Sequence, residues 1–133
     1  MSTDPVTTLI DAIDRKDPSG IRAAYREDAR LVAMTPNTFQ VHDGAGAVTA
    51  KLAEWFATWE EEPAYSFIDV VRGPERVAIE FERTSTSEGE PWVVRQAHLL
   101  ELGEGGIREH HMYCCGPRQG TPELAEAVGR RAS

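Results

Sequence analysis

The second half of the chain limits its fold most strongly, because it holds four long strand-like segments separated only by short turns. The three turns read Gly-Pro, Ser-Glu-Gly-Glu and Gly-Glu-Gly-Gly. Strands that are joined by short turns of this kind usually pair with their neighbours in antiparallel order. We therefore expect a four-stranded meander at residues 65–72, 77–86, 91–102 and 107–115.

The first half carries helical patterns instead. Apolar residues recur every three or four positions in residues 6–13, directly after Asp4-Pro5, a capping residue followed by proline at the first helical position. Asp17-Pro18 repeats that start signal and predicts a second helix, which includes Tyr25 and ends near residues 27–28.

A short hairpin and a third helix are expected next. The hairpin combines a strand at residues 29–34 with a second one at 39–42. The helix covers residues 47–59 and is expected to be well buried through its apolar positions Val48, Leu52, Trp55, Phe56 and Trp59. The whole pattern predicts an α+β fold.

The length of 133 residues suits one domain without disulfide or metal support. We expect residues 1–133 to form it, with a core at about 5–115 and a partly flexible tail at 116–133. Fourteen Lys and Arg against 22 Asp and Glu give a net charge of -8, which disfavours nucleic acid and membrane surfaces as partners.

The N-terminal segment lacks the basic start and apolar run of a signal peptide, so we expect a cytoplasmic location. The two cysteines, Cys114 and Cys115, are adjacent, which would strain a mutual disulfide and cannot supply a four-cysteine zinc site. Reduced thiols fit the cytoplasm.

The order helix, helix, hairpin, helix, meander resembles the nuclear transport factor 2-like (SnoaL-like) superfamily over about residues 5–115. Residues 24–31, Ala-Tyr-Arg-Glu-Asp-Ala-Arg-Leu, are similar to its passage from second helix to first strand, and residues 105–110, Gly-Gly-Ile-Arg-Glu-His, to its final hairpin. The resemblance implies three helices on a strongly curved, mostly antiparallel sheet, which form a cone around an apolar pocket, and a homodimer.

The resemblance also suggests which side chains face the pocket. His98 falls where several relatives have a functional acid, and His110, Met112 and Cys114 fall on the inward side of the last strand. Because strand side chains alternate, one inward residue sets the rest of its strand. The inward set then gains Trp92, Val94, Gln96, Val77, Ile79 and Phe81.

The same alternation describes the opposite face of the sheet. Glu80 and Glu82 are expected to point to solvent, because turning that strand over would expose Ile79 and Phe81 and lose about 1.5–3 kcal/mol for each. The outer face would be unusually apolar, which suits a dimer interface. Its expected members are Val93, Arg95, Ala97, His111 and Tyr113.

Two neighbouring imidazoles in an apolar pocket can position a water or share acid and base roles, because imidazole titrates near neutral pH. The pair formed by His98 and His110 is similar to the histidine pair of scytalone dehydratase-type relatives. Two hydrogen-bonded core histidines without a catalytic role remain the alternative.

Other candidate residues have both a functional and a structural interpretation. Tyr25, Trp55 and Trp59 would give flat walls to a planar ligand, or belong to the core. Cys114 is either a nucleophile activated by His110 or an inert thiol. A zinc site from Cys114 and the two histidines has no evident fourth ligand.

Several family active sites are not reproduced. By resemblance, Leu9 and Ala33 stand where ketosteroid isomerases have a catalytic tyrosine and an aspartate base, and Met112 where many cyclases have an aspartate. The sequence therefore favours a small enzyme without a cofactor that moves protons on an apolar, oxygenated molecule such as a polyketide or terpenoid. It would be a dehydratase, isomerase or cyclase with His98 and His110 as acid/base groups; the alternative is a non-catalytic binding or dimerisation domain.

Overall fold

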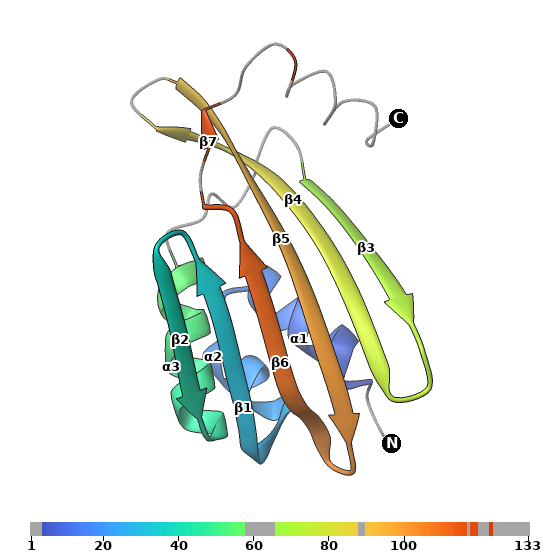
Figure 1. Ribbon diagram of the computed structural model, residues 1–133. Helices are drawn as coiled ribbons and strands as arrows, with labels where there is room; N and C mark the ends of the chain where they lie inside the picture. Colours follow the sequence, from blue (N-terminus) through green and yellow to red (C-terminus); the bar gives the residue numbers. More distant parts are fainter. Residues whose placement is uncertain (1–3, 58–65, 88–89, 117, 120–122, 124–133) are drawn as a thin grey trace.

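The computed structural model describes residues 4–57, 66–87, 90–116, 118–119 and 123. Three helices lie together behind one broad sheet (Figure 1). They are α1 (Pro5–Asp14), α2 (Pro18–Ala23) and α3 (Ala45–Phe56). The strands are β1 (Tyr25–Thr35), β2 (Thr38–Asp43), β3 (Ser66–Arg72), β4 (Arg76–Ser87), β5 (Glu90–Gly103), β6 (Gly106–Cys114) and β7 (Arg118–Gln119).

The first two helices begin where the sequence predicts. The Asp4 carboxylate accepts hydrogen bonds from the backbone N–H groups of Val6 and Thr7, and Asp17 caps α2 through Ser19. The prediction that α2 reaches residues 27–28 is wrong. It ends at Ala23, and Tyr25 is the first residue of β1 because it pairs with β6.

The sheet has the strand order β2-β1-β6-β5-β4-β3, and β7 pairs with one end of β5. The expected meander is confirmed, since β3, β4, β5 and β6 pair consecutively and antiparallel. β1 and β6 pair in parallel, a contact between distant segments that the sequence did not predict. The sheet is mostly antiparallel and open, with β2 and β3 as its edges, and the expected α+β cone-type fold is confirmed.

A close approach at Gly106 fixes where β6 starts relative to β1. The Ile107 N–H donates to the Ala24 carbonyl at 2.9 Å. A Cβ atom at Gly106 would lie 2.7 Å from that same carbonyl oxygen, and the φ of 137° there suits glycine. This junction brings the ring of Tyr25 beside the inward side chains of β6.

The helices cover one face of the sheet, and the buried core lies between the helices and that face. No helix in the described part of the chain has the length and apolar character that a membrane span requires. The main apolar side chains of this core are Val6, Leu9, Ile21, Leu31, Val48, Leu52, Phe56, Val77, Ile79, Leu100, Ile107 and Met112.

Two expectations about the outer face of the sheet are wrong. Glu82 does not point to solvent: its side chain is 1% exposed, because Arg95 lies directly opposite in the β4–β5 register and its Nε donates across 2.7 Å. Val93 is buried rather than exposed, at the position where β7 pairs with β5. The tail expected at residues 116–133 lies mostly outside the described residues.

Candidate active site

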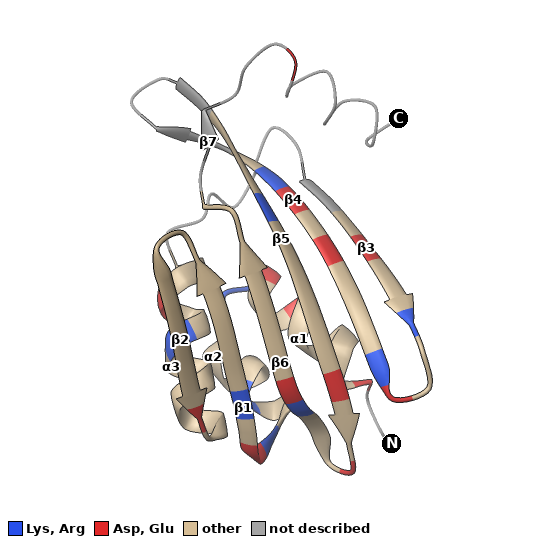
Figure 2. Cartoon of the chain, viewed as in Figure 1, with Lys and Arg blue, Asp and Glu red and all other residues tan. Residues whose placement is uncertain are grey.

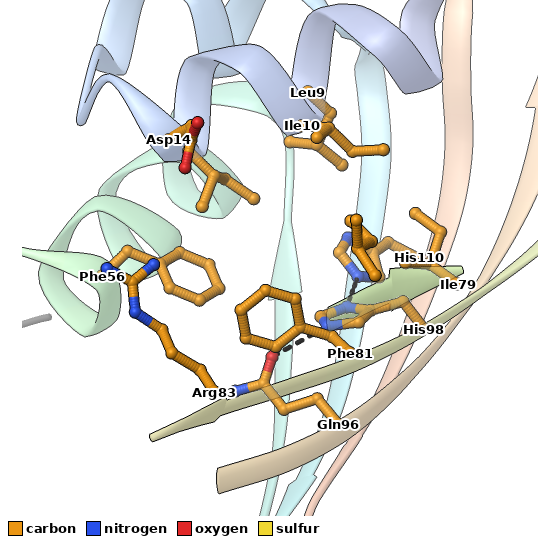
Figure 3. Close-up of a pocket in the computed structure, with 12 residues that line it drawn as sticks. Leu9, Ile10, Asp14, Phe56, Ile79, Phe81, Arg83, Gln96, His98 and His110 are labelled. Carbon is orange, nitrogen blue, oxygen red and sulfur yellow. Dashed lines mark hydrogen bonds between the residues drawn. The ribbon is translucent and has the colours of Figure 1, made fainter. Parts of the chain in front are cut away.

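A cavity of about 210 Å³ lies between α1 and the inward face of the sheet (Figure 3). Its walls are mainly apolar, and its polar side chains gather in two places. Three of them, Gln96, His98 and His110, lie together on β5 and β6, while Asp14 and Arg83 come from α1 and β4. The apolar lining residues are Leu9, Ile10, Ile13, Phe56, Ile68, Ile79 and Phe81.

A continuous chain of hydrogen bonds runs from the cavity into the core. The Tyr25 hydroxyl lies 2.6 Å from Nδ1 of His110, and Nε2 of His110 lies 2.7 Å from Nδ1 of His98. Nε2 of His98 lies 2.8 Å from the side-chain oxygen of Gln96. The Gln96 amide nitrogen in turn donates to the sulfur of Cys114 at 3.5 Å.

Sheet register brings these side chains together. His98 pairs with Met112 and His110 pairs with Leu100, so the two histidines are diagonal neighbours on the same face of β5 and β6. Their ring centroids are 5.0 Å apart. Both are almost fully buried, with 6% of His98 and none of His110 exposed to solvent. The predicted inward register of these two strands is therefore confirmed.

The direction of these hydrogen bonds is set by Gln96 at one end of the series and by Tyr25 at the other. The carbonyl oxygen of Gln96 can only accept, so Nε2 of His98 carries a proton and its Nδ1 accepts from the Nε2–H of His110. Nδ1 of His110 then accepts from the Tyr25 hydroxyl. The opposite direction would leave the buried phenol proton without an acceptor among the described residues, which costs about 1–3 kcal/mol.

Burial keeps the hydrogen-bonded side chains of Tyr25, His110 and His98 neutral. Desolvation lowers the pKa of His98 from 6.5 to about 4 and holds the pKa of His110 well below its usual value, the latter with help from the neighbouring His98 and His111. Desolvation also raises the pKa of the Tyr25 hydroxyl. Neither buried histidine therefore titrates near neutrality, contrary to the usual behaviour of imidazole.

The structure places four of the predicted site residues at the cavity and several others behind its wall. His98, His110, Gln96 and Phe81 line it. Tyr25 lies behind the wall, where its hydroxyl bonds to His110 and the two rings are stacked at 9°. Met112 is buried in the core, and Cys114 packs against that core at its edge.

The tryptophans do not line the cavity in the described part of the chain. Trp55 packs against the core from α3, with the Lys51 ammonium 5.6 Å from its ring centre. Trp92 is half-buried on β5, beyond the cavity. Trp55 therefore matches the alternative that the sequence left open, a position in the core, and Trp92 is not among the described residues that line the cavity. Trp59 lies outside the described residues.

Several other lining residues were not assigned to the pocket from the sequence. Phe56 closes one side from the end of α3, and Ile68 lies on β3 with 43% of its surface exposed. Arg83 continues the inward set of Ile79 and Phe81 by two residues, so alternation along β4 could have identified it. Asp14 lies at the end of α1 and is exposed, and with Ile68 it marks where the cavity reaches solvent.

The contacts of Cys114 bear on two functional interpretations of this residue, a thiol activated by His110 and a ligand of a metal ion. Both ring nitrogens of His110 are bonded to Tyr25 and His98, so His110 does not activate this thiol. The sulfur accepts from Gln96 and from the backbone N–H of Gly116. Within the described ranges, no group of three or more His, Cys, Asp or Glu side chains is placed to hold a metal ion.

Solved structures show the same fold at low identity. A protein of ketosteroid isomerase-like fold from Catenulispora acidiphila, in complex with trimethylamine, is 19% identical over 87% of this chain and 88% of its own, with a TM-score of 0.66. A provisionally assigned isomerase from Rhodopseudomonas palustris is 18% identical over 98% and 100%, with a TM-score of 0.67. An NTF2-like protein from Cytophaga hutchinsonii is 17% identical over 83% and 96%, with a TM-score of 0.63.

No curated protein matches the chain significantly in sequence. The model of the SnoaL-like domain matches residues 6–110, which contain all of the three helices except Pro5, the strands β1 to β5, and His110. This match covers well over half of the 133 residues. The chain belongs to the SnoaL-like domain family.

Proposed function

We propose that this protein is a small enzyme that needs no added cofactor and catalyses proton transfer on an apolar, oxygenated molecule such as a polyketide or terpenoid. The reaction would be a dehydration, isomerisation or cyclisation. The observation that carries the proposal is the bonded pair of His98 and His110, which lies at an apolar cavity with an exposed side. Polar groups that converge in such a cavity are the usual sign of a small-molecule site.

His98 is the residue that contacts substrate in this mechanism. Its Nε2–H now donates to Gln96. When a substrate oxygen replaces the Gln96 carbonyl, the same N–H donates to that oxygen. It then stabilises the negative charge that develops there while water at the exposed side of the cavity takes the proton from the adjacent carbon. His110 and Tyr25 hold the tautomer that keeps this proton on Nε2.

Complete transfer of the proton to substrate is less favourable. It would draw the His110 proton to His98 and the phenol proton to His110, and would leave a phenolate whose formation burial opposes. In the opposite tautomer the Gln96 amide is turned and its nitrogen donates to His98 Nε2; a substrate that displaces Gln96 then meets a lone pair on Nε2 that can accept its proton. Burial makes this a weak base, because the pKa of His98 is about 4.

Exchange of carbon-bound protons tests the proposal without knowledge of the natural substrate. 2-Tetralone, an apolar cyclic ketone, is incubated with protein in D₂O, and deuterium entry beside its carbonyl is followed by NMR. We expect a rate that rises with protein concentration and falls on the order of 100-fold in His98→Gln. His111→Gln, a histidine on the opposite face, serves as the matched control. No acceleration over buffer, or equal rates in His98→Gln and the parent, would refute the proposal.

A non-catalytic binding domain is the second candidate. It is favoured by the fact that all four ring nitrogens of His98 and His110 already have hydrogen-bond partners in the protein. In that case 2-tetralone or a related ketone would bind in the cavity without any accelerated exchange. The exchange assay therefore separates the two candidates.

We also propose a homodimer through the outer sheet face. Figure 2 shows that the upper parts of β2, β1 and β6 contain no charged residues. Register places exposed apolar side chains on one face of these strands and of β5. They are Met34, Phe39, Val41, Leu99 and Tyr113, which are between 40% and 63% exposed. A continuous apolar face of this kind favours association with a second copy.

A charge in the middle of this face is expected to separate the dimer. Leu99 lies on the central strand β5 opposite His111. Leu99→Asp should shift sedimentation from dimer to monomer at micromolar concentrations, because burying an unpaired carboxylate costs several kcal/mol. Arg15→Glu, at the end of α1 and away from the sheet face, is the control. A parent protein that sediments as a monomer would contradict the dimer.

A cytoplasmic location is part of the proposal. The free thiols of Cys114 and Cys115 support it, because reduced cysteines suit a reducing compartment.

A further inference from the structure

The cavity at His98 is small for a ligand site. Its volume is about 210 Å³, whereas pockets that take drug-sized ligands usually measure about 300–1,000 Å³. An apolar cavity of about 150 Å³ takes up one benzene ring, so the space here suits one ring with a second ring fused to it, about 8–12 non-hydrogen atoms. A rigid four-ring skeleton has roughly twice as many atoms and exceeds this space.

The inner end of the cavity is bounded by side chains of the buried core. Leu9 on α1 is 2% exposed and Ile79 on β4 is 6% exposed, and both belong to the core cluster. Figure 3 shows that α1 holds Leu9 and Ile10 over the histidine pair. Packed side chains of this kind give way only at a cost, because extra volume forces them out of their preferred rotamers. The inner end therefore sets a firm limit on ligand size.

Ile79 stands directly beside the group that is proposed to bind the substrate oxygen. The β4–β5 register pairs Ile79 with His98, and both side chains line the cavity. Residues that are paired in this way have their Cβ atoms about 4.5–5.5 Å apart. A ligand oxygen that accepts from Nε2 of His98 thus brings the neighbouring ligand carbons against Ile79. Because isoleucine is branched at Cβ, its side chain is stiff and does not swing aside easily.

We propose that the cavity takes compact carbonyl compounds of about two fused rings, about 8–12 non-hydrogen atoms, and that Ile79 limits their width beside the carbonyl. This inference rests on the proposed function for the carbonyl at His98, and it narrows the substrate class to the smallest polyketides and terpenoids. The size limit itself concerns binding and does not depend on catalysis. Ile79 is a specificity-determining residue, and the proton transfer remains at His98.

Three ketones of increasing size test the limit by equilibrium dialysis against the parent protein at pH 7: cyclohexanone, 2-tetralone and the four-ring androstenedione. We expect 2-tetralone to bind at least about tenfold more tightly than cyclohexanone, because it buries more apolar surface in the same cavity. It should also bind at least about tenfold more tightly than androstenedione, which overfills the cavity. Unspecific binding to an apolar surface would give the opposite order, with androstenedione the tightest.

A fourth ketone tests the role of Ile79. 2,2,6,6-Tetramethylcyclohexanone has as many non-hydrogen atoms as 2-tetralone but carries methyl groups on both sides of the carbonyl. The parent should bind it at least about tenfold more weakly than 2-tetralone. Ile79→Ala should remove most of this difference, and Ile79→Val, which loses a single methyl group, should remove part of it. Ile21→Val, a buried isoleucine of α2 outside the lining residues, is the matched control and should behave as the parent.

Equal or tighter binding of androstenedione than of 2-tetralone, or no binding of 2-tetralone at about 10 mM, would overturn the inference. So would equal affinity of the parent for 2-tetralone and the tetramethyl ketone. These comparisons use the parent protein, so they decide the question even if Ile79→Ala does not fold. The proposed function fails separately: if His98 is not catalytic, the 2-tetralone exchange is absent while the order of affinities by size persists.

Discussion

Lowering the pH from 7 to 4 is expected to cost the protein about 3 kcal/mol of unfolding free energy through His98 alone. The unfolded imidazole binds a proton with a pKa near 6.5, whereas the folded one resists protonation until a pKa of about 4. Below pH 6.5 the unfolded state therefore binds more protons than the folded state, and stability falls as the pH falls. The stabilising contribution of His98 is fully present above pH 6.5 and decreases as the pH falls from 6.5 to 4.

Urea unfolding at pH 7, 6 and 5 measures this effect in a window where most exposed carboxylates stay ionised. The buried His110 adds to the slope in the same direction, since its pKa is also lowered. His98→Gln should have a shallower pH dependence than the parent. His111→Gln, which changes a half-buried histidine on the outer face, is the matched control. Parallel curves for the parent and His98→Gln would contradict buried, neutral imidazoles.

Truncation of His110 is expected to be the most damaging single change in the site. His110→Ala removes the middle of the hydrogen-bond chain and leaves both the Tyr25 hydroxyl and Nδ1 of His98 buried without their partner. Each such loss costs about 1–3 kcal/mol, and the vacated space adds to it. We expect a total of about 3–5 kcal/mol, a large part of the stability of an ordinary domain.

The neighbouring His111→Ala is the matched control for this measurement. His111 is half-buried on the outer face, and its contact with Glu109 at 3.2 Å involves a partly exposed pair. Such pairs contribute about 0–1 kcal/mol. Chemical unfolding should therefore separate the two variants by at least about 2 kcal/mol, and similar values for both would show that the chain of hydrogen bonds adds little.

Most of the fold could be predicted from local patterns. Cap and proline signals at Asp4-Pro5 and Asp17-Pro18 gave both helix starts, and turn residues gave the strands of the meander. The parallel contact between β1 and β6 could not be predicted in this way, because no local pattern encodes pairing between segments about 80 residues apart. The end of α2 was missed for the same reason, since pairing with Ile107 draws Tyr25 into the sheet.

The site was predicted in part by strand alternation. The family resemblance supplied the register of the strands. Strand alternation then placed His98, His110 and Gln96 on one face, as the structure has them. It could not foresee that Glu82 would be buried, because that depends on Arg95 lying opposite in the neighbouring strand. Burial of the imidazoles also changes their chemistry, and composition alone gives no sign of a pKa near 4.

The most direct test of the account is nitrogen NMR of the two buried imidazoles, followed from pH 8 to pH 4. We expect His98 and His110 to be neutral at pH 7 with the proton on Nε2 of each ring, and His98 to become protonated only near pH 4. Protonation of either buried ring near pH 6.5, or a proton on Nδ1 at pH 7, would contradict the neutral hydrogen-bond chain from which the proposed chemistry is derived.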